Sequence, residues 1–309
     1  MRKTLKRAVT FKGVGLHGGQ AARMVVAPAE AETGIRFYRT DLPEAARCIP
    51  ARHDLVTDTR LCTKISNGAG ASLGTIEHIM AALAGLGIND AAVSVDGPEV
   101  PIMDGSSCIF TDALMQAGLR PLDAPLRAIR ILAPVSVERD GKSARLLPSE
   151  TFSMGFAIEF ADPAIGTQSL ALDLAGATFV EELADCRTFG HLAEVEHLRK
   201  LGLARGGSLE NAIVVDRGRV LNPEGLRCPD EFVRHKMLDA MGDLALAGAP
   251  IIGRYEGEKA GHEITNLLLH ALFAAPETWE WTDAMADRLP AVTATTPLPR
   301  HHATEAVAV

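Results

Sequence analysis

The sequence has few aromatic residues and no excess of positive charge. Phe, Trp and Tyr make up 5% of its 309 residues, and 39 acidic against 31 basic side chains give a formal net charge of -8. Proteins whose main partner is nucleic acid usually carry a basic surface, so this balance predicts no nucleic-acid partner. No apolar run approaches the roughly 18 residues that a membrane helix needs, so we expect no integral membrane segment. No protein partner is evident either.

Cysteine is scarce and shows no pairing pattern. The 5 cysteines are an odd number, widely spaced and without a C-x-x-C pair, at Cys48, Cys62, Cys108, Cys186 and Cys228. This pattern indicates neither a disulfide framework nor a thiolate zinc site. The basic N-terminal stretch lacks the apolar segment of a signal peptide, which favours a cytoplasmic location.

Apolar residues are abundant, and their spacing alternates between strand and helix periods. They form 47% of the chain. Single cores stop growing beyond roughly 250–300 residues, so two domains are expected. In the first part of the chain, the periodicity predicts strands at 8–11, 22–27, 35–39 and 91–95, and helices at 72–86 and 106–118.

The same order of elements returns after a proline-containing stretch at 120–125, which is the best linker candidate. Strands are expected at 127–138, 142–147, 152–160, 212–216 and 251–255, and helices at 191–201, 229–247 and 262–273. Both long helices carry a histidine two residues before a methionine, at His78 and His235. We interpret this as a divergent internal duplication. It predicts an α+β protein with domains at 1–123 and 124–296 and a flexible tail at 297–309.

A glycine-rich segment at 13–18 matches the dinucleotide-binding pattern G-x-G-x-x-G. That motif requires a helix directly behind the glycines, whereas the residues that follow here read as a strand. We therefore interpret the segment as a hairpin turn, with His17 on the surface.

The sharpest chemical signal lies in the expected helix at 229–247. His235, Asp239 and Asp243 are spaced four residues apart, so their side chains lie along one face of the helix. His235 and Asp239 can then bind the same metal ion. An exposed polar face is the alternative that the spacing alone leaves open.

The matching helix of the first half begins with Glu77-His78. If the two halves meet, His78 approaches His235 and Asp239. Two histidines and one carboxylate form a recognised catalytic zinc set with one position left for water. Glu77 then has the chemistry of a base for that water. A solvated helix edge is the alternative interpretation of this pair.

His262 opens the last expected helix, where the helix dipole disfavours a charged imidazole. A carboxylate such as Asp243 restores the charge, which would suit a general acid. The alternative is a surface or capping histidine.

Five segments, taken together, resemble the UDP-3-O-acyl-N-acetylglucosamine deacetylases, the zinc enzymes of the committed step of lipid A biosynthesis. They are Thr75-Ile76-Glu77-His78, Pro101-Ile102-Met103-Asp104-Gly105-Ser106, Arg187-Thr188-Phe189-Gly190, Arg234-His235-Lys236-Met237-Leu238-Asp239 and Gly261-His262. The resemblance runs from Thr4 to about Trp281. It implies two duplicated α/β sandwich domains that pack through their helices, each with a small insert, near 40–65 and 185–215.

The resemblance also implies roles for individual residues. His78, His235 and Asp239 would hold Zn²⁺, and Glu77 would be the general base. Thr188 and protonated His262 would stabilise the oxyanion, and His262, oriented by Asp243, would protonate the departing amine. Lys236, Phe189 and Cys62 match positions that contact the substrate, a UDP-sugar with an acyl chain. The second insert is expected to shape the acyl passage, where His191 replaces the aromatic residue of many members.

Two alternatives stay open. The same metal ligands could serve a hydrolase of another substrate. The chain could also be a binding module for sugar nucleotides or lipids that has lost catalysis. The second alternative predicts a missing base or acid, yet the chain has both Glu77 and His262.

Overall fold

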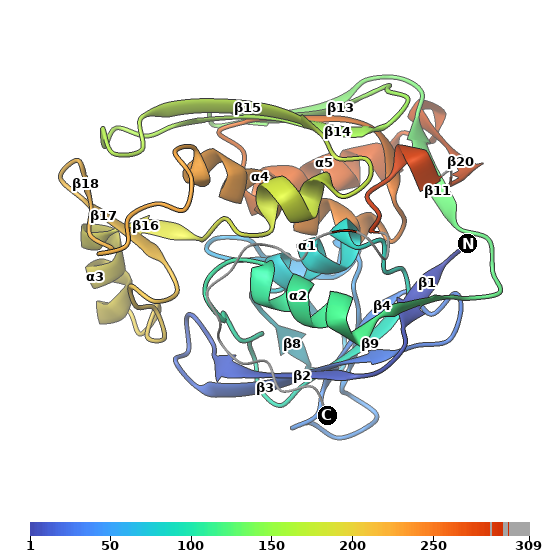
Figure 1. The fold of residues 1–309 in the computed structure, drawn as a ribbon, viewed down its shortest axis with the longest axis horizontal. Helices are drawn as coiled ribbons and strands as arrows, with labels where there is room; N and C mark the ends of the chain where they lie inside the picture. The colour runs from blue at the N-terminus through green and yellow to red at the C-terminus, as the bar shows by residue number, and fades with distance from the viewer. Residues whose placement is uncertain (285, 293–295, 297–309) are drawn as a thin grey trace.

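Two β-sheets form the outer layers of the protein, and helices lie between them (Figure 1). The computed structural model describes residues 1–309 except 285, 293–295 and 297–309. The mixed α+β class predicted from the sequence is confirmed. In the described part of the chain, no helix has the length and apolar character that crossing a bilayer requires.

The first sheet has five strands in the order β2-β3-β9-β4-β5. Its strands are β2 (Val9–Val14), β3 (Ala21–Pro28), β9 (Ala91–Val95), β4 (Ile35–Arg39) and β5 (Cys48–Pro50). Alternate residues of β9 are buried, so one face of the sheet packs on the core. The helices α1 (Glu77–Gly85) and α2 (Cys108–Ala117) lie on this inner side (Figure 1).

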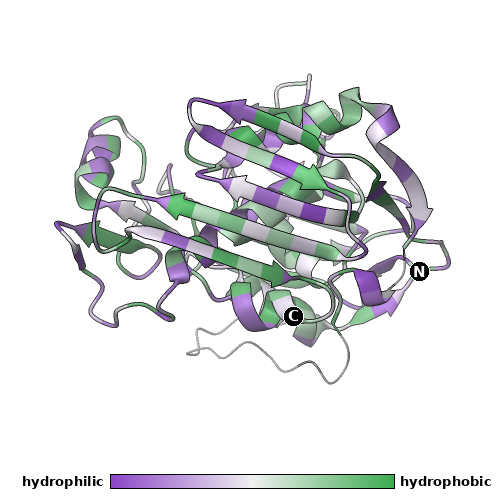
Figure 2. Cartoon of the chain, turned by 90° about the horizontal axis from the view of Figure 1, so that it is seen from above, coloured by the Kyte–Doolittle hydropathy of each residue, from purple (hydrophilic) through white to green (hydrophobic). Residues whose placement is uncertain are grey.

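The second sheet has seven strands centred on β19 (Ile251–Glu258). The others are β11 (Arg127–Ile131), β12 (Val135–Arg139), β13 (Lys142–Leu147), β14 (Phe152–Glu159), β15 (Thr167–Asp173) and β20 (Trp279–Asp283). Figure 2 looks onto its outer side, where hydrophilic and hydrophobic residues mix along the strands. The helices α4 (Glu231–Leu244) and α5 (His262–Ala274) cover its inner side (Figure 1).

Three smaller sheets complete the fold. One pairs β1 (Lys3–Leu5) with β10 (Leu119–Pro121), and another joins β6 (Val56–Asp58), β7 (Lys64–Ser66) and β8 (Ser72–Leu73). The third contains β16 (Phe189–His191), β17 (Ile213–Asp216) and β18 (Arg219–Val220). With α3 (Leu192–Lys200) it projects from one end of the molecule, where the second insert is expected (Figure 1).

Short helical turns fill the remaining connections. They are the π-helix Phe179–Leu183 and the 3₁₀ turns His53–Leu55, Ala245–Ala247, Pro276–Thr278 and Ala286–Arg288. The first of these packs against α4.

The helices α1 and α4 pack closely at the centre of the molecule. Gly242 on α4 makes this approach possible, since a Cβ atom there would lie 2.0 Å from the carbonyl oxygen of Glu77 on α1. Gly85 at the other end of α1 makes room for the π-helix Phe179–Leu183 instead, because a Cβ atom there would lie 2.0 Å from the ring of Phe179. The two layers therefore meet along helices whose backbones nearly touch.

Most predicted elements are found, and two of them differ most from the expectation. The expected helix at 72–86 begins only at Glu77, because Ser72–Leu73 pairs as β8 and Thr75 has a positive φ of 59°. The expected strand at 127–138 is two strands, β11 and β12. The predicted domain boundary at 123/124 falls between β10 and β11 and stays a prediction. The tail predicted at 297–309 lies outside the described residues.

Candidate metal centre

Three buried side chains converge where α1 meets α4. His78 comes from the first turn of α1, and His235 and Asp239 come from successive turns of α4. Asp239 Oδ1 lies 3.4 Å from His78 Nε2 and 3.3 Å from His235 Nε2. One ligand atom from each residue lies within 4.8 Å of the other two. The three residues could therefore hold one metal ion.

The hydrogen bonds around the three candidate ligands leave His235 Nε2 and Asp239 Oδ1 available to bind a metal ion. His235 Nδ1 lies 3.0 Å from the carbonyl oxygen of Cys186, to which it donates, so its Nε2 presents a lone pair toward Asp239. Asp239 Oδ1 is buried without a hydrogen bond in the part of the chain that the structure describes. A buried carboxylate oxygen without a partner is costly, and a cation at this point would satisfy it.

The charge states agree with metal binding. Burial lowers the pKa of His235 to about 3, despite the opposing effect of Asp239, so its imidazole is neutral. Burial acts to raise the pKa of Asp239, but the ammonium of Lys236, at 2.7 Å, contributes to holding that pKa well below its usual range. Neutral imidazoles and an ionised carboxylate are the ligand forms that zinc requires.

Glu77 lies beside the three candidate ligands, at the start of α1. Burial raises its pKa, an effect that the charge of His262 opposes. Its Oε2 accepts a hydrogen bond of 3.1 Å from the backbone amide of Thr63. Its Oε1 lies 3.9 Å from His262 Nε2, so both atoms can contact the same reacting group.

His262 is held from its other side by Asp243. Its Nδ1 donates to Asp243 Oδ2 at 2.8 Å. Burial lowers the pKa of His262, but Asp243 and then Glu77 outweigh it and raise that pKa to about 9. The imidazole therefore carries a proton at neutral pH and can give it up to a base.

Lys236, Phe189 and Cys62 surround the same centre. Lys236 Nζ donates to Asp239 Oδ2 at 2.7 Å. The ring of Phe189 lies 6.2 Å from that of His235 and packs edge-on against Phe232. Burial and the neighbouring Glu77 raise the pKa of Cys62 to about 12, so its thiol stays protonated.

Thr188 is placed through its backbone. Its amide donates to Gly105 in the first half of the chain, and its carbonyl accepts from Ile213, each at 2.8 Å. The structure thus brings Thr188 to the seam between the halves, while its role as an oxyanion donor stays a prediction.

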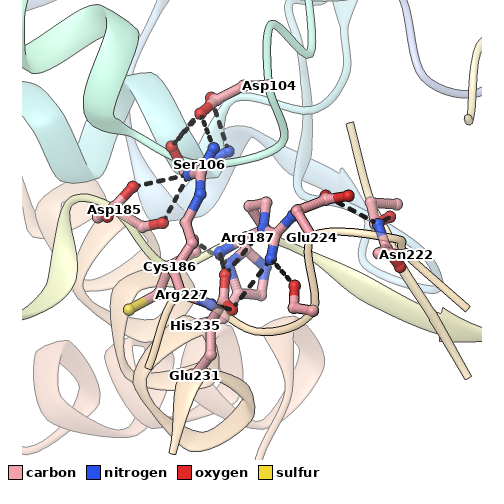
Figure 3. A network of polar contacts seen from close by, with 12 residues as sticks. Asp104, Ser106, Asp185, Cys186, Arg187, Asn222, Glu224, Arg227, Glu231 and His235 are labelled. Carbon is pink, nitrogen blue, oxygen red and sulfur yellow. Dashed lines mark hydrogen bonds and ion pairs between the residues drawn. The ribbon is translucent and has the colours of Figure 1, made fainter. Parts of the chain in front are cut away.

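A buried ionic network supports this side of the centre (Figure 3). Glu231, in the first turn of α4, accepts from the backbone amide of Arg187 at 3.0 Å and from its guanidinium at 2.9 Å. Arg187 follows Cys186, whose carbonyl accepts from His235. The ion pair therefore fixes both the candidate ligand helix and the acceptor that orients its histidine.

The network also joins the two halves of the chain. Arg227 donates to Asp104 at 2.9 Å and to Asp185 at 2.7 Å (Figure 3). Asp104 belongs to the expected first domain and Arg227 to the second, so this ion pair holds the two sides of the centre together.

The sequence interpretation missed three features of this region. Thr63 contacts both Glu77 and Asp243, although no motif marks it. Glu231 was read only as part of a helix start. His17 was expected on the surface, yet both ring nitrogens are buried, and burial lowers its pKa. Among these, only Glu231 has a signal in the sequence, since it lies one turn before a candidate ligand histidine.

Comparison with known proteins gives the family. The family described as UDP-3-O-acyl N-acetylglycosamine deacetylase matches residues 2–274. A UDP-3-O-acyl-N-acetylglucosamine deacetylase of Phenylobacterium zucineum is 54% identical over 89% of this chain and 94% of its own length. Proteins with the same name from Acidithiobacillus ferrooxidans and Legionella pneumophila are 47% and 45% identical, over 94% and 91% of this chain and 95% and 92% of their own lengths. The chain therefore belongs to the UDP-3-O-acyl-N-acetylglucosamine deacetylase family.

Proposed function

We propose that this protein hydrolyses the N-acetyl group of UDP-3-O-acyl-N-acetylglucosamine to the free amine and acetate, the committed step of lipid A biosynthesis. The observation that carries the proposal is the convergence of His78, His235 and Asp239 beside Glu77 and His262, in a chain of this family. An acid, a base and a metal set are the groups that amide hydrolysis needs.

We assign the metal ligands to His78, His235 and Asp239 and the metal to Zn²⁺. The donor set supports zinc, since two imidazoles and one carboxylate leave one coordination position open. When bound, such a metal supplies Lewis acidity, which polarises a carbonyl and makes water easier to deprotonate near neutral pH. Fe²⁺ accepts similar ligands, so metal analysis has to decide between the two.

Glu77 is the general base of the proposal. The backbone amide of Thr63 holds its Oε2, which leaves Oε1 directed toward His262. Its raised pKa brings its basicity closer to the operating pH, which favours proton transfer. Glu77 takes one proton from water as the water oxygen bonds to the acetamide carbon.

His262 is the general acid. It gives its Nε2 proton to the nitrogen of the substrate as the C–N bond breaks, because an amine anion is a very poor leaving group. Asp243 keeps the imidazole charged until then. Acetate leaves with the oxygen from water, and the sugar leaves as the free amine.

The remaining predicted residues contact the substrate. Lys236 supplies local positive charge, which an anionic UDP group needs in a protein with a formal net charge of -8. The Thr188 hydroxyl is an additional donor for the oxyanion. Phe189 and Cys62 line the position of the sugar, and α3 with its small sheet borders the acyl chain. A nucleotide-sugar substrate supports the cytoplasmic location expected from the sequence.

The test combines metal analysis with acetate release by the purified protein. We expect about one zinc per chain and release of acetate from UDP-3-O-acyl-N-acetylglucosamine, with much slower release from UDP-N-acetylglucosamine, which lacks the acyl chain. Bound metal without acetate release would favour a binding module. Equal rates with both substrates would favour a hydrolase of broader or different specificity.

A further inference from the structure

Thr63 touches both carboxylates of the proposed acid–base machinery. Its backbone amide donates to Glu77 Oε2 at 3.1 Å, and its hydroxyl donates to Asp243 Oδ1 at 2.5 Å. Thr63 is 2% exposed, so both contacts are shielded from bulk water. Thr63 directly precedes β7 in the first half of the chain, whereas Asp243 lies on α4 in the second.

The hydroxyl fixes the rotation of the Asp243 carboxylate. One oxygen of Asp243 accepts from Thr63, and the other accepts from His262 Nδ1 at 2.8 Å. A carboxylate held at both oxygens cannot turn about its terminal bond without losing one of these contacts. The plane of the His262 ring is thereby set, and Nε2 faces Glu77 at 3.9 Å from Oε1.

The backbone amide fixes Glu77 from the same residue. Because one backbone segment holds both carboxylates, the distance between the base and the acid depends on Thr63 rather than on two independent supports. This matters for rate, since a misplacement of about 1 Å in a reacting group can cost about 10²-fold.

We infer that Thr63 is a positioning residue that sets the geometry between Glu77 and His262. The inference rests on the proposed deacetylation, in which these two groups, 3.9 Å apart, act on the same scissile amide as base and acid. Thr63 does not touch the reacting atoms itself; its hydroxyl acts through Asp243. The hydroxyl is therefore the part that substitution can test, while the backbone contact to Glu77 is retained.

The experiment compares Thr63→Val, which keeps the shape and removes the hydroxyl, with Thr63→Ser, which keeps the hydroxyl. We expect Thr63→Val to lower kcat at least about tenfold, with KM changed less than about twofold and metal content unchanged. Thr63→Ser should restore most of kcat. Thr57→Val is the matched control, because Thr57 is an exposed residue of the same small sheet, and its hydroxyl lies 2.8 Å from that of Ser66, away from both carboxylates.

A second measurement does not depend on turnover. The Nδ1 proton of His262 gives a proton NMR resonance that is assigned by its loss in His262→Gln. This resonance should shift in Thr63→Val and stay in place in Thr63→Ser and Thr57→Val. An unshifted resonance, or a kcat in Thr63→Val equal to that of the unchanged protein, would overturn the inference.

The two proposals fail separately. A protein that binds metal but releases no acetate overturns the proposed function, and the NMR comparison still decides whether Thr63 positions His262. In another outcome, the unchanged protein releases acetate while Thr63→Val and Thr63→Ser lose activity to the same extent. If both variants also lose bound metal and have a lower melting temperature, Thr63 is needed only for the structure.

Discussion

Asp243 Oδ2 and His262 Nδ1 lie 2.8 Å apart, and this hydrogen bond joins the fourth helix to the first residue of the fifth. The contact explains how a histidine at a helix N-terminus, where the dipole opposes a positive charge, keeps its proton. The pKa of His262 is raised to about 9 because Asp243 and Glu77 outweigh the effect of burial.

The first prediction concerns pH. An acid with a raised pKa is protonated below that pKa and loses its proton above it, so activity should fall as the pH rises through about 9. Asp243→Asn removes the charge that contributes most to raising the pKa of His262. The alkaline limb of the kcat profile should then move to lower pH, with the largest loss of activity above pH 7. Identical alkaline limbs in both proteins would contradict the assignment of His262 as the acid.

Glu77→Ala should separate metal binding from turnover. Glu77 is not among the three candidate ligands, so the variant should keep its metal. Without the base, kcat should fall by a factor on the order of 10² or more. Metal analysis and acetate release measure the two effects, and near-normal turnover would remove Glu77 from this role.

His235→Ala should act on the metal itself. It removes one of three candidate ligands and leaves Asp239 with one imidazole fewer. We expect a large loss of zinc affinity, measured by competition with a chelator, and a matching loss of activity. His197→Ala is the control, because His197 lies exposed on α3. Full zinc retention in His235→Ala would exclude it as a ligand.

Substitution of either glutamate that contacts Arg187 should lower the stability of the fold, but by very different amounts. Glu231 is fully buried beside Arg187, whereas the side chain of Glu224 is 54% exposed on the same guanidinium. Glu231→Gln removes the only fully buried carboxylate that contacts Arg187 among the described residues, and breaking a buried ion pair costs about 3–5 kcal/mol in comparable cases. Glu224→Gln should cost at most about 1 kcal/mol, as exposed pairs do. Denaturant unfolding measures both, and equal losses would contradict the importance of the buried pair.

The helix of His235 and its line of polar side chains could be predicted, because both depend only on the local spacing of residues. A four-residue spacing places His235, Asp239 and Asp243 on one helix face, and the structure has all three buried there. The helix of Glu77 was predicted to begin too early, since the positive φ of Thr75 has no sequence signal in a non-glycine residue. The meeting of α1 and α4 was inferred from the repeat and from the family resemblance rather than from the residues of either helix alone.

Thr63 shows where sequence reasoning stops. Its two contacts join residues that are 14 and 180 positions away in the chain. No local pattern distinguishes a threonine with such contacts from one on the surface. The same holds for the pairing of Arg187 with Glu231, which are 44 positions apart. These contacts depend on the tertiary arrangement alone.

The division of the three candidate ligands between α1 and α4 has a thermodynamic consequence. His78 lies on a helix that covers the first sheet, and His235 and Asp239 lie on one that covers the second. A cation held by all three residues binds more tightly when the two sheet-and-helix layers are packed together than when they are apart. Metal binding at this site and packing of the two layers are therefore thermodynamically linked. Free metal at a hundredfold excess over its dissociation constant would stabilise the docked state by about 2.7 kcal/mol. A metal bound by these three residues would therefore contribute to the stability of the protein as well as to its chemistry.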